Sequence, residues 1–171
     1  MFNAPLTPLG HEQCRNVLKN FPRMEKITHV FCSPLTRTLE TALECFKPIY
    51  ERGVEIVAWD QLIEIGEVPC NKGDPLPILR SKASGMPINL DHLSEGWELT
   101  DQTLKATKAR LRLVAKTLYD LWQGSSQFGD RKEGDEHIEI VVISHGTFLT
   151  NLISNRESLR NCWLPTQDAD K

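Results

Sequence analysis

Two strand-to-helix junctions in this chain carry side chains that are suited to binding an anion. In the first, at residues 138–149, a run of β-branched residues ends at Ser144-His145-Gly146 and a helical pattern follows. The imidazole of His145 can donate a hydrogen bond to a phosphate oxygen, and Gly146 lets the backbone come close. N–H groups of the following helix would point at the same anion. Taken alone, such a histidine is more often a structural hydrogen-bonding residue.

The second junction follows a β-rich run at residues 27–32, which ends in the sequence SPLTR. Ser33 is suited to the N-cap of a helix over residues 34–46, with proline at its first position. Arg37 then falls in the first helical turn, where the helix dipole disfavours a cation. A bound phosphate would account for it, because a guanidinium pairs with phosphate oxygens in a bidentate fork. The alternative is a solvated surface arginine, but Arg37 together with His145 favours a phosphate site.

Four segments of the chain, in their order, resemble the histidine phosphatase superfamily in its phosphoglycerate mutase-like branch. They are Leu6-Thr7-Pro8-Leu9-Gly10 with Gln13, Ser33-Pro34-Leu35-Thr36-Arg37-Thr38 with Thr41-Ala42, Leu62-Ile63-Glu64, and Ser144-His145-Gly146. Two further segments, Pro69-Cys70 and Glu95-Gly96-Trp97, are similar to fungal members of that branch. The resemblance covers about residues 4–153, which is most of the chain.

The resemblance implies a chemical role for each of these site residues. Arg37 and His145 would hold the equatorial oxygens of a phosphoryl group, with the backbone at Gly146 close by. Glu64 matches the acidic residue that protonates the leaving oxygen and then activates water. The alternatives are that Glu64 is an exposed loop carboxylate or that Glu67 is the acid.

The element that defines the family is missing from this sequence. Members of the family begin with a strand that runs into Arg-His-Gly, and its histidine attacks phosphorus to form a phosphohistidine. Only residues 1–5 precede Leu6, and none of them is Arg or His. The other histidines fall in an expected helix, inside a strand, or in or beside loops: His11, His29, His92 and His137. We therefore expect a truncated gene model or splice form that is inactive as written, in preference to an evolved pseudoenzyme.

Strands that alternate with helices predict an α/β fold, a three-layer sandwich with a mostly parallel sheet and helices on both faces. The whole chain is expected to form one domain, incomplete at its N-terminus and, because no strand-like run follows residue 153, at its C-terminus. The first strand, central in the family's sheet, would be missing. Residues 65–98 are expected to be an irregular insertion, which in the family covers the active-site mouth. The expected elements are helices at 8–22, 34–46, 77–82 and 100–122, strands at 27–32, 54–59 and 138–143, and a polar loop at 124–136.

Composition excludes several classes of function. The 171 residues carry a net charge of −3 with no basic stripe, so nucleic acid is not an expected partner. No apolar run is long enough to span a bilayer and no signal-peptide pattern is present, which indicates a cytoplasmic protein without membrane partners. The five scattered cysteines indicate reduced thiols. His11-Glu12 does not extend to HExxH, because Arg15 stands at the last position, and no metal or cofactor is expected.

Three hypotheses of function follow from the sequence. The first is a phosphatase-family enzyme that acts on a small phosphorylated metabolite. The second is an inactive pseudoenzyme that binds a phosphorylated ligand or a protein partner. The third is an unrelated α/β binding domain. The first two predict that the tips of Arg37 and His145 lie within about 10 Å of each other, with Glu64 at the rim of the same site.

Overall fold

A parallel sheet forms the centre of the molecule in the computed structural model, which describes residues 1–124, 128 and 138–154. Its described strands lie in the order β3-β2-β1-β4. β1 pairs in parallel with β2 on one side and with β4 on the other. The strands are β1 (His29–Cys32), β2 (Ile56–Ala58), β3 (Ile88–Asn89) and β4 (Ile140–Ile143). All these pairs are parallel, so the carboxyl ends of the strands meet at one end of the sheet.

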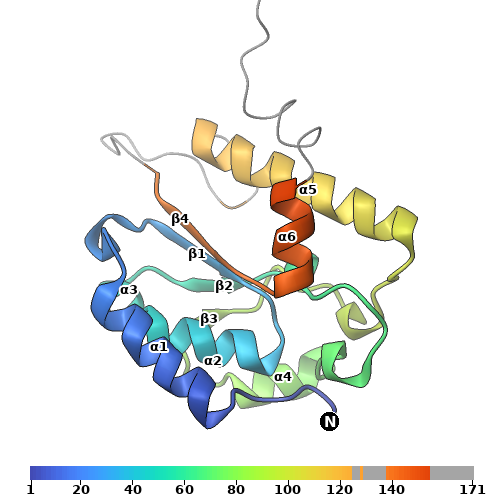
Figure 1. Cartoon of the computed structure of the whole chain (residues 1–171), viewed down its shortest axis with the longest axis horizontal. Coiled ribbons are helices and arrows are strands. Elements are labelled where there is room, and N and C mark those ends of the chain that lie inside the picture. The colour runs from blue at the N-terminus through green and yellow to red at the C-terminus, as the bar shows by residue number, and fades with distance from the viewer. Residues whose placement is uncertain (125–127, 129–137, 155–171) are drawn as a thin grey trace, which may run out of the picture.

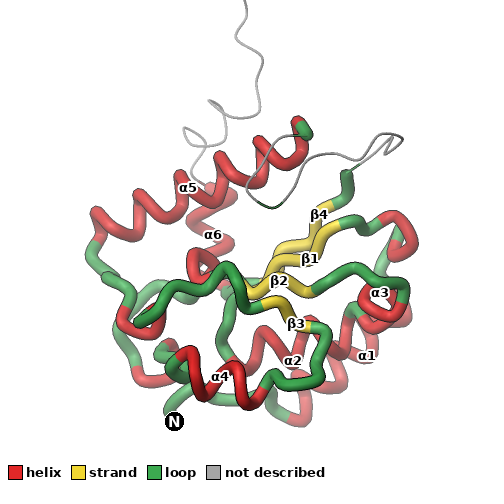
Figure 2. Tube along the Cα trace, turned by 180° about the vertical axis from the view of Figure 1, so that it is seen from behind, coloured by secondary structure: helices red, strands yellow, loops and turns green. Residues whose placement is uncertain are grey.

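Helices cover both faces of the sheet, as Figure 1 shows. One face carries α1 (Pro8–Asn20), α2 (Thr36–Cys45), α3 (Lys47–Glu51) and α4 (Leu76–Lys82). The other face carries α5 (Leu104–Gln123) and α6 (Gly146–Ser154). Short 3-10 helices lie between them: η1 (Met24–Lys26), η2 (Asp60–Leu62), η3 (Pro69–Asn71) and η4 (Trp97–Leu99). The predicted α/β sandwich is thus confirmed, and the view from behind in Figure 2 shows its strands between the two helical layers.

Alternating side chains of the strands build two hydrophobic cores. In β1, Val30 and Cys32 pack into the core under α1–α4, whereas Phe31 packs into the core under α5 and α6. β4 alternates in the same way, with Ile143 in the first core and Val142 against the second. A strand that is apolar on both faces is what the continuous β-branched runs in the sequence predict.

The predicted N-cap of α2 is wrong. The helix begins at Thr36, and Leu35 occupies the cap position without a side-chain bond. Ser33 stays with the sheet, because its N–H donates to the carbonyl of Ile143 at 2.9 Å. The Thr36 N–H instead donates to the side chain of Asn3, at 2.9 Å from its Oδ1. A residue 33 positions away in the chain therefore satisfies the end of this helix.

The insertion at residues 65–98 is more regular than predicted. The short helix expected near residue 77 is present as α4. The sequence analysis missed β3, which pairs with β2 through Ile88 and Ile56 and adds a strand to the sheet. A strand of two residues carries too little periodicity to be recognised.

The remaining predictions concern the strands of the sheet, the polar loop, membrane-spanning helices and the cysteines. β1 pairs directly with both β2 and β4, so the described strands form one continuous sheet. Most of the loop predicted at 124–136 lies outside the described residues, as does the stretch after residue 154. No helix in the part of the chain that the structure describes is both long and apolar enough to cross a bilayer. Four of the cysteines are free thiols: Cys14, Cys32, Cys45 and Cys70.

Candidate active site

Arg37 and His145 meet at the carboxyl end of the sheet. Arg37 lies in the first turn of α2, after β1, and His145 directly follows β4. The Arg37 Nη2 donates to the Nδ1 of His145 at 3.1 Å. The predicted convergence of the two side chains is confirmed, since they are in direct contact. We call Arg37, His145 and Glu64 the candidate site.

His145 is buried and neutral. It is only 6% exposed, and its Nε2 lies 2.8 Å from the Oγ of Ser33. A guanidinium can only donate, so Nδ1 accepts from Arg37 and the ring proton sits on Nε2, which donates to Ser33. Burial, followed by the charges of Arg37 and Arg110, lowers the pKa of His145 from 6.5 to about 3. The side chain can therefore present a neutral N–H donor at ordinary pH.

Arg37 is held by the loop that follows Glu64. Its Nη1 donates to the Cys70 carbonyl at 2.7 Å, and its Nη2 donates to the Asn71 Oδ1 at 3.2 Å. Burial lowers the pKa of Arg37, while Cys70 and Glu64 act in the opposite direction. The arginine is half-buried with three polar partners, so it is not the solvated surface residue that the sequence left open.

Glu64 caps the helix that follows His145. Its Oε1 accepts from the Phe148 N–H at 2.9 Å, and its Oε2 accepts from the Thr147 N–H at 3.3 Å. A carboxylate at a helix N-terminus is favoured by the free N–H groups and by the dipole. These contacts agree with the predicted position of Glu64 at the rim of the site that contains Arg37 and His145. Glu67, the competing acid, is exposed and lines a separate cavity.

Gly146 opens space at the same junction. It is the first residue of α6, and a Cβ built there would meet no atom within 4 Å. The protein's own packing therefore does not require glycine at this position. A ligand at the candidate site could use the open space beside the backbone.

Arg110 is a site neighbour that the sequence analysis missed. It lies on α5 and is 4% exposed, with Nη1 donating to the Ile63 carbonyl at 3.1 Å. Its Cζ lies 5.2 Å from the centre of the Phe148 ring, and its Nε and Nη2 have no hydrogen-bond partner among the described residues. Burial lowers the pKa of Arg110 to about 10, although Glu64 and Asp60 oppose the shift.

A sequence signal for Arg110 did exist. It shares the helical face of Thr107, Leu111 and Val114, all of which are buried. Four other basic residues of the same helix are exposed: Lys105, Lys108, Arg112 and Lys116. A cation inside the apolar stripe of a helix differs from such a set and indicates a buried role.

The described residues contain no group of three or more His, Cys, Asp or Glu side chains that could hold a metal ion. The candidate site is thus built from a guanidinium, an imidazole and a carboxylate on a parallel sheet. These groups can bind an oxyanion and transfer a proton.

A parallel sheet with helices on both faces, which carries these groups at its carboxyl end, defines an α/β protein. The family model described as the histidine phosphatase superfamily (branch 1) matches residues 2–161, so the chain belongs to that superfamily. The ecdysone phosphate phosphatase from Bombix mori, solved in complex with tungstate, has a similar fold, with a TM-score of 0.60 and 20% identity. The match covers 98% of this chain and 61% of that chain, so this chain spans less than two thirds of its length. No curated protein sequence matches the chain.

Proposed function

We propose that the candidate site binds the phosphoryl group of a small phosphorylated metabolite and supports hydrolysis of its phosphomonoester. The observation that carries the proposal is the contact of 3.1 Å between Arg37 and His145 at the carboxyl end of the sheet. Membership of the superfamily supports it, as does the tungstate in the structurally similar phosphatase, because tungstate is a tetrahedral oxyanion like phosphate.

In this proposal the phosphate takes over contacts that the two side chains now make with each other. Arg37 would turn Nη2 from the His145 ring to a phosphate oxygen, and His145 would offer its Nε2–H in place of the bond to Ser33. A dianion nearby favours the protonated imidazole, so binding would raise the pKa of His145 above its value of about 3. The open space at Gly146 would admit a third oxygen.

Glu64 would supply the proton for the leaving oxygen. A nucleophile forms a bond to phosphorus, the bond from phosphorus to the ester oxygen breaks, and Glu64 gives that oxygen a proton. Where an enzyme histidine is the nucleophile, as in the family, Glu64 would then accept a proton from the water that releases phosphate; where water attacks directly, phosphate leaves in the one displacement and the proton of that water passes to a phosphate oxygen or to solvent. The Glu64 carboxylate accepts from the N–H groups of Thr147 and Phe148, and these residues follow His145 by two and three positions in the chain.

In this proposal the rate of hydrolysis depends on which group attacks phosphorus. The family forms a phosphohistidine, but His11 lies in α1, His29 lies at the start of β1, and His92 lies beyond β3. His137 is outside the described residues. We propose that water must attack in this chain as given and that turnover is therefore very slow. The same observation supports a second candidate function, an inactive relative that only binds a phosphorylated ligand or partner.

We also infer a finer placement within the superfamily. The segments Pro69-Cys70 and Glu95-Gly96-Trp97 support a phosphoglycerate mutase-like protein of fungal type. In this structure the first of them contributes the Cys70 carbonyl that holds Arg37. The free thiols among the described cysteines support a cytoplasmic location.

Titration calorimetry with inorganic phosphate and with vanadate tests the binding half of the proposal. We expect Arg37→Met to weaken binding at least tenfold, because a charge-assisted fork is lost. The matched control is Arg112→Met, an exposed arginine on α5. Equal affinity in Arg37→Met and the unchanged protein would contradict the proposed site.

A further inference from the structure

Arg110 joins the two segments that hold Glu64 in the candidate site. It lies on α5, and its Nη1 donates to the carbonyl of Ile63, the residue before Glu64, at 3.1 Å. Its Cζ lies 5.2 Å from the centre of the Phe148 ring. The N–H of Phe148 in turn donates to the Oε1 of Glu64 at 2.9 Å. Arg110 therefore contacts both the loop that carries Glu64 and the helix that Glu64 caps.

These contacts join the two hydrophobic cores at the carboxyl end of the sheet. Ile63 belongs to the core under α1–α4 and Phe148 to the core under α5 and α6, and both side chains are buried. A second side chain holds the same loop, because the Oγ of Ser144 donates to the carbonyl of Leu62 at 2.7 Å. The backbone that leads into Glu64 is thus fixed by hydrogen bonds from two distant parts of the chain.

Arg110 is too deeply buried to contact a ligand. It is 4% exposed, and its Nε and Nη2 are buried without a hydrogen-bond partner among the described residues. Any effect of its guanidinium on a bound phosphate must therefore pass through the residues that it touches. Of these, Ile63 and Phe148 both lead to Glu64.

Packing alone does not account for a guanidinium at this position. A buried charge with one hydrogen bond is costly, and replacing buried charged groups by apolar ones of similar volume is often neutral or stabilising. Burial lowers the pKa of Arg110 to about 10, while the carboxylates of Glu64 and then Asp60 oppose the shift. The buried cation thus has its counter-charge in the candidate site.

We propose that Arg110 is a positioning residue for Glu64: its hydrogen bond, its ring contact and its positive charge hold the carboxylate at the start of α6. The inference rests on the proposed function, in which Glu64 gives a proton to the ester oxygen beside Arg37 and His145. Proton transfer needs a donor within hydrogen-bond reach, about 2.6–3.2 Å. A displacement of about 1 Å can lower the rate of an enzyme about a hundredfold.

Amide hydrogen exchange of the 171-residue chain, followed by NMR, tests the proposal. The Phe148 N–H reports on Glu64, because the carboxylate is its acceptor. The Leu149 N–H is the internal reference, because it donates to the His145 carbonyl at 2.9 Å. We expect Arg110→Met to speed exchange of the Phe148 N–H about tenfold, since a charge-assisted hydrogen bond is lost, and to leave the Leu149 N–H unchanged.

Two further variants separate the charge of Arg110 from its shape. Arg110→Lys retains the positive charge and should keep exchange of the Phe148 N–H within about threefold of the unchanged protein. Arg110→Gln is neutral, although it can still donate a hydrogen bond, and should behave like Arg110→Met. This pair decides the test if Arg110→Met does not fold. The matched control is Arg112→Met, an exposed arginine of the same helix, which should leave both N–H groups unchanged.

Unchanged exchange at Phe148 in the two neutral variants overturns the proposal, as does equal acceleration at Phe148 and Leu149, which would show a general loosening of α6. Exchange in Arg110→Lys as fast as in Arg110→Gln overturns the role of the charge. Titration calorimetry with inorganic phosphate keeps the proposed function apart. If Arg37→Met retains full phosphate affinity while Arg110→Met frees the Phe148 N–H, the proposed function fails and Arg110 still holds Glu64. If Arg37→Met weakens binding and exchange at Phe148 never changes, only the positioning role fails.

Discussion

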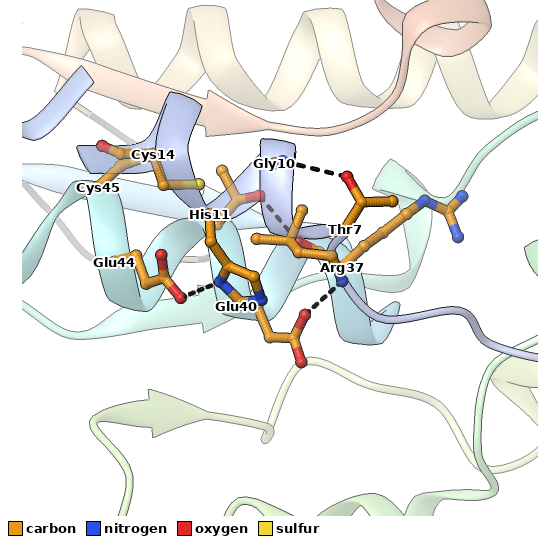
Figure 3. Close-up of polar contacts among 10 residues, drawn as sticks. Thr7, Gly10, His11, Cys14, Arg37, Glu40, Glu44 and Cys45 are labelled. Carbon is orange, nitrogen blue, oxygen red and sulfur yellow. Dashed lines mark hydrogen bonds and ion pairs between the residues drawn. The ribbon is translucent and has the colours of Figure 1, made fainter. Parts of the chain in front are cut away.

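The two ends of helix α2 show how differently this molecule treats polar side chains. At the α1–α2 junction, which contains Thr7, His11, Glu40 and Glu44, polar groups pair with each other (Figure 3). The His11 Nδ1 lies 2.5 Å from the Glu44 Oε1, with the two side chains 36% and 34% exposed, and the Leu6 N–H donates to Glu40 at 2.6 Å.

At the candidate site the arrangement is reversed. Arg37 leaves the same helix in another direction, as Figure 3 shows, and meets His145, which is 6% exposed. Arg110 nearby is buried with two nitrogens that lack partners among the described residues. Polar groups at the junction pair with each other while about one third exposed, whereas His145 at the site is buried and its neighbour Arg110 keeps two nitrogens without a partner among the described residues. Buried polar groups with shifted pKa values are candidates for a functional site.

The largest expected effect is on the rate of phosphomonoester hydrolysis. We expect the candidate site to lack a nucleophile, and we expect changes at the α1–α2 junction to leave the rate unaltered. The 171-residue chain should hydrolyse p-nitrophenyl phosphate about four to six orders of magnitude more slowly than a site with a covalent nucleophile. Added imidazole should raise the rate by attacking phosphorus, with N-phosphoimidazole as the product and nitrophenolate leaving as the anion. The rate of nitrophenolate release measures both effects.

Arg37→Met should lose the imidazole response, because the phosphoryl group is no longer held, whereas Glu44→Gln at the junction should keep it. A high rate without imidazole would show that another group of this chain is the nucleophile. An imidazole response that survives in Arg37→Met would place the chemistry elsewhere.

A second prediction compares two glycines near the site. Gly73→Ala should lower the free energy of unfolding by about 1–3 kcal/mol, because its Cβ would overlap the Trp97 ring. Gly146→Ala, whose Cβ would meet open space, should leave stability unchanged or slightly raised. Urea denaturation measures both, and equal losses in the two variants would contradict the tight packing of Trp97.

A third prediction uses the pH dependence of stability. The pKa of His145 is about 3 in the folded protein and 6.5 as its ordinary value, so the unfolded chain binds a proton that the folded chain excludes. Stability from this group is complete above pH 6.5 and is lost as the pH falls toward 3. At pH 5 the loss should be about 2 kcal/mol relative to pH 7, because one pKa unit corresponds to about 1.4 kcal/mol.

The loss is measured as the difference in unfolding free energy between the two pH values. His145→Gln should flatten that difference, whereas His11→Gln, at the exposed junction, should retain it. A His145→Gln variant with the same slope as the unchanged protein would show that other groups titrate.

The smallest effect is expected at the junction itself. Removing the His11–Glu44 pair by Glu44→Gln should change the unfolding free energy by less than about 1 kcal/mol, because half-exposed pairs are screened by water and salt. A double-mutant cycle with His11→Gln measures the coupling. A coupling comparable to the pH effect of His145 would erase the contrast between the two regions.

The sequence predicted those features that depend on strand ends and helical periodicity. Because the carboxyl ends of parallel strands meet, Arg37 and His145 could be placed together from two separate segments. Glu64 followed from its match to the acidic position of the resembling family, although its capping of α6 did not.

Features that depend on contacts between distant residues could not be predicted in this way. Asn3 binds the start of α2 over 33 positions, and Ser33 reaches His145 over 112 positions. No local pattern selects such partners, so Ser33 looked like an ordinary N-cap. The buried Arg110 required its whole helical face to be compared with its exposed neighbours.

The position of Glu64 has a consequence for competition among ligands. Its carboxylate already occupies the place where the N-terminus of α6 would hold a free anion. A group tethered by its own chain competes at an effective concentration in the millimolar range or above, far higher than most metabolites reach. In the proposed function, an incoming phosphate would bind beside this internal competitor, with its ester oxygen within reach of the carboxylate. An anion that required the N-terminal N–H groups of α6 would first have to displace Glu64.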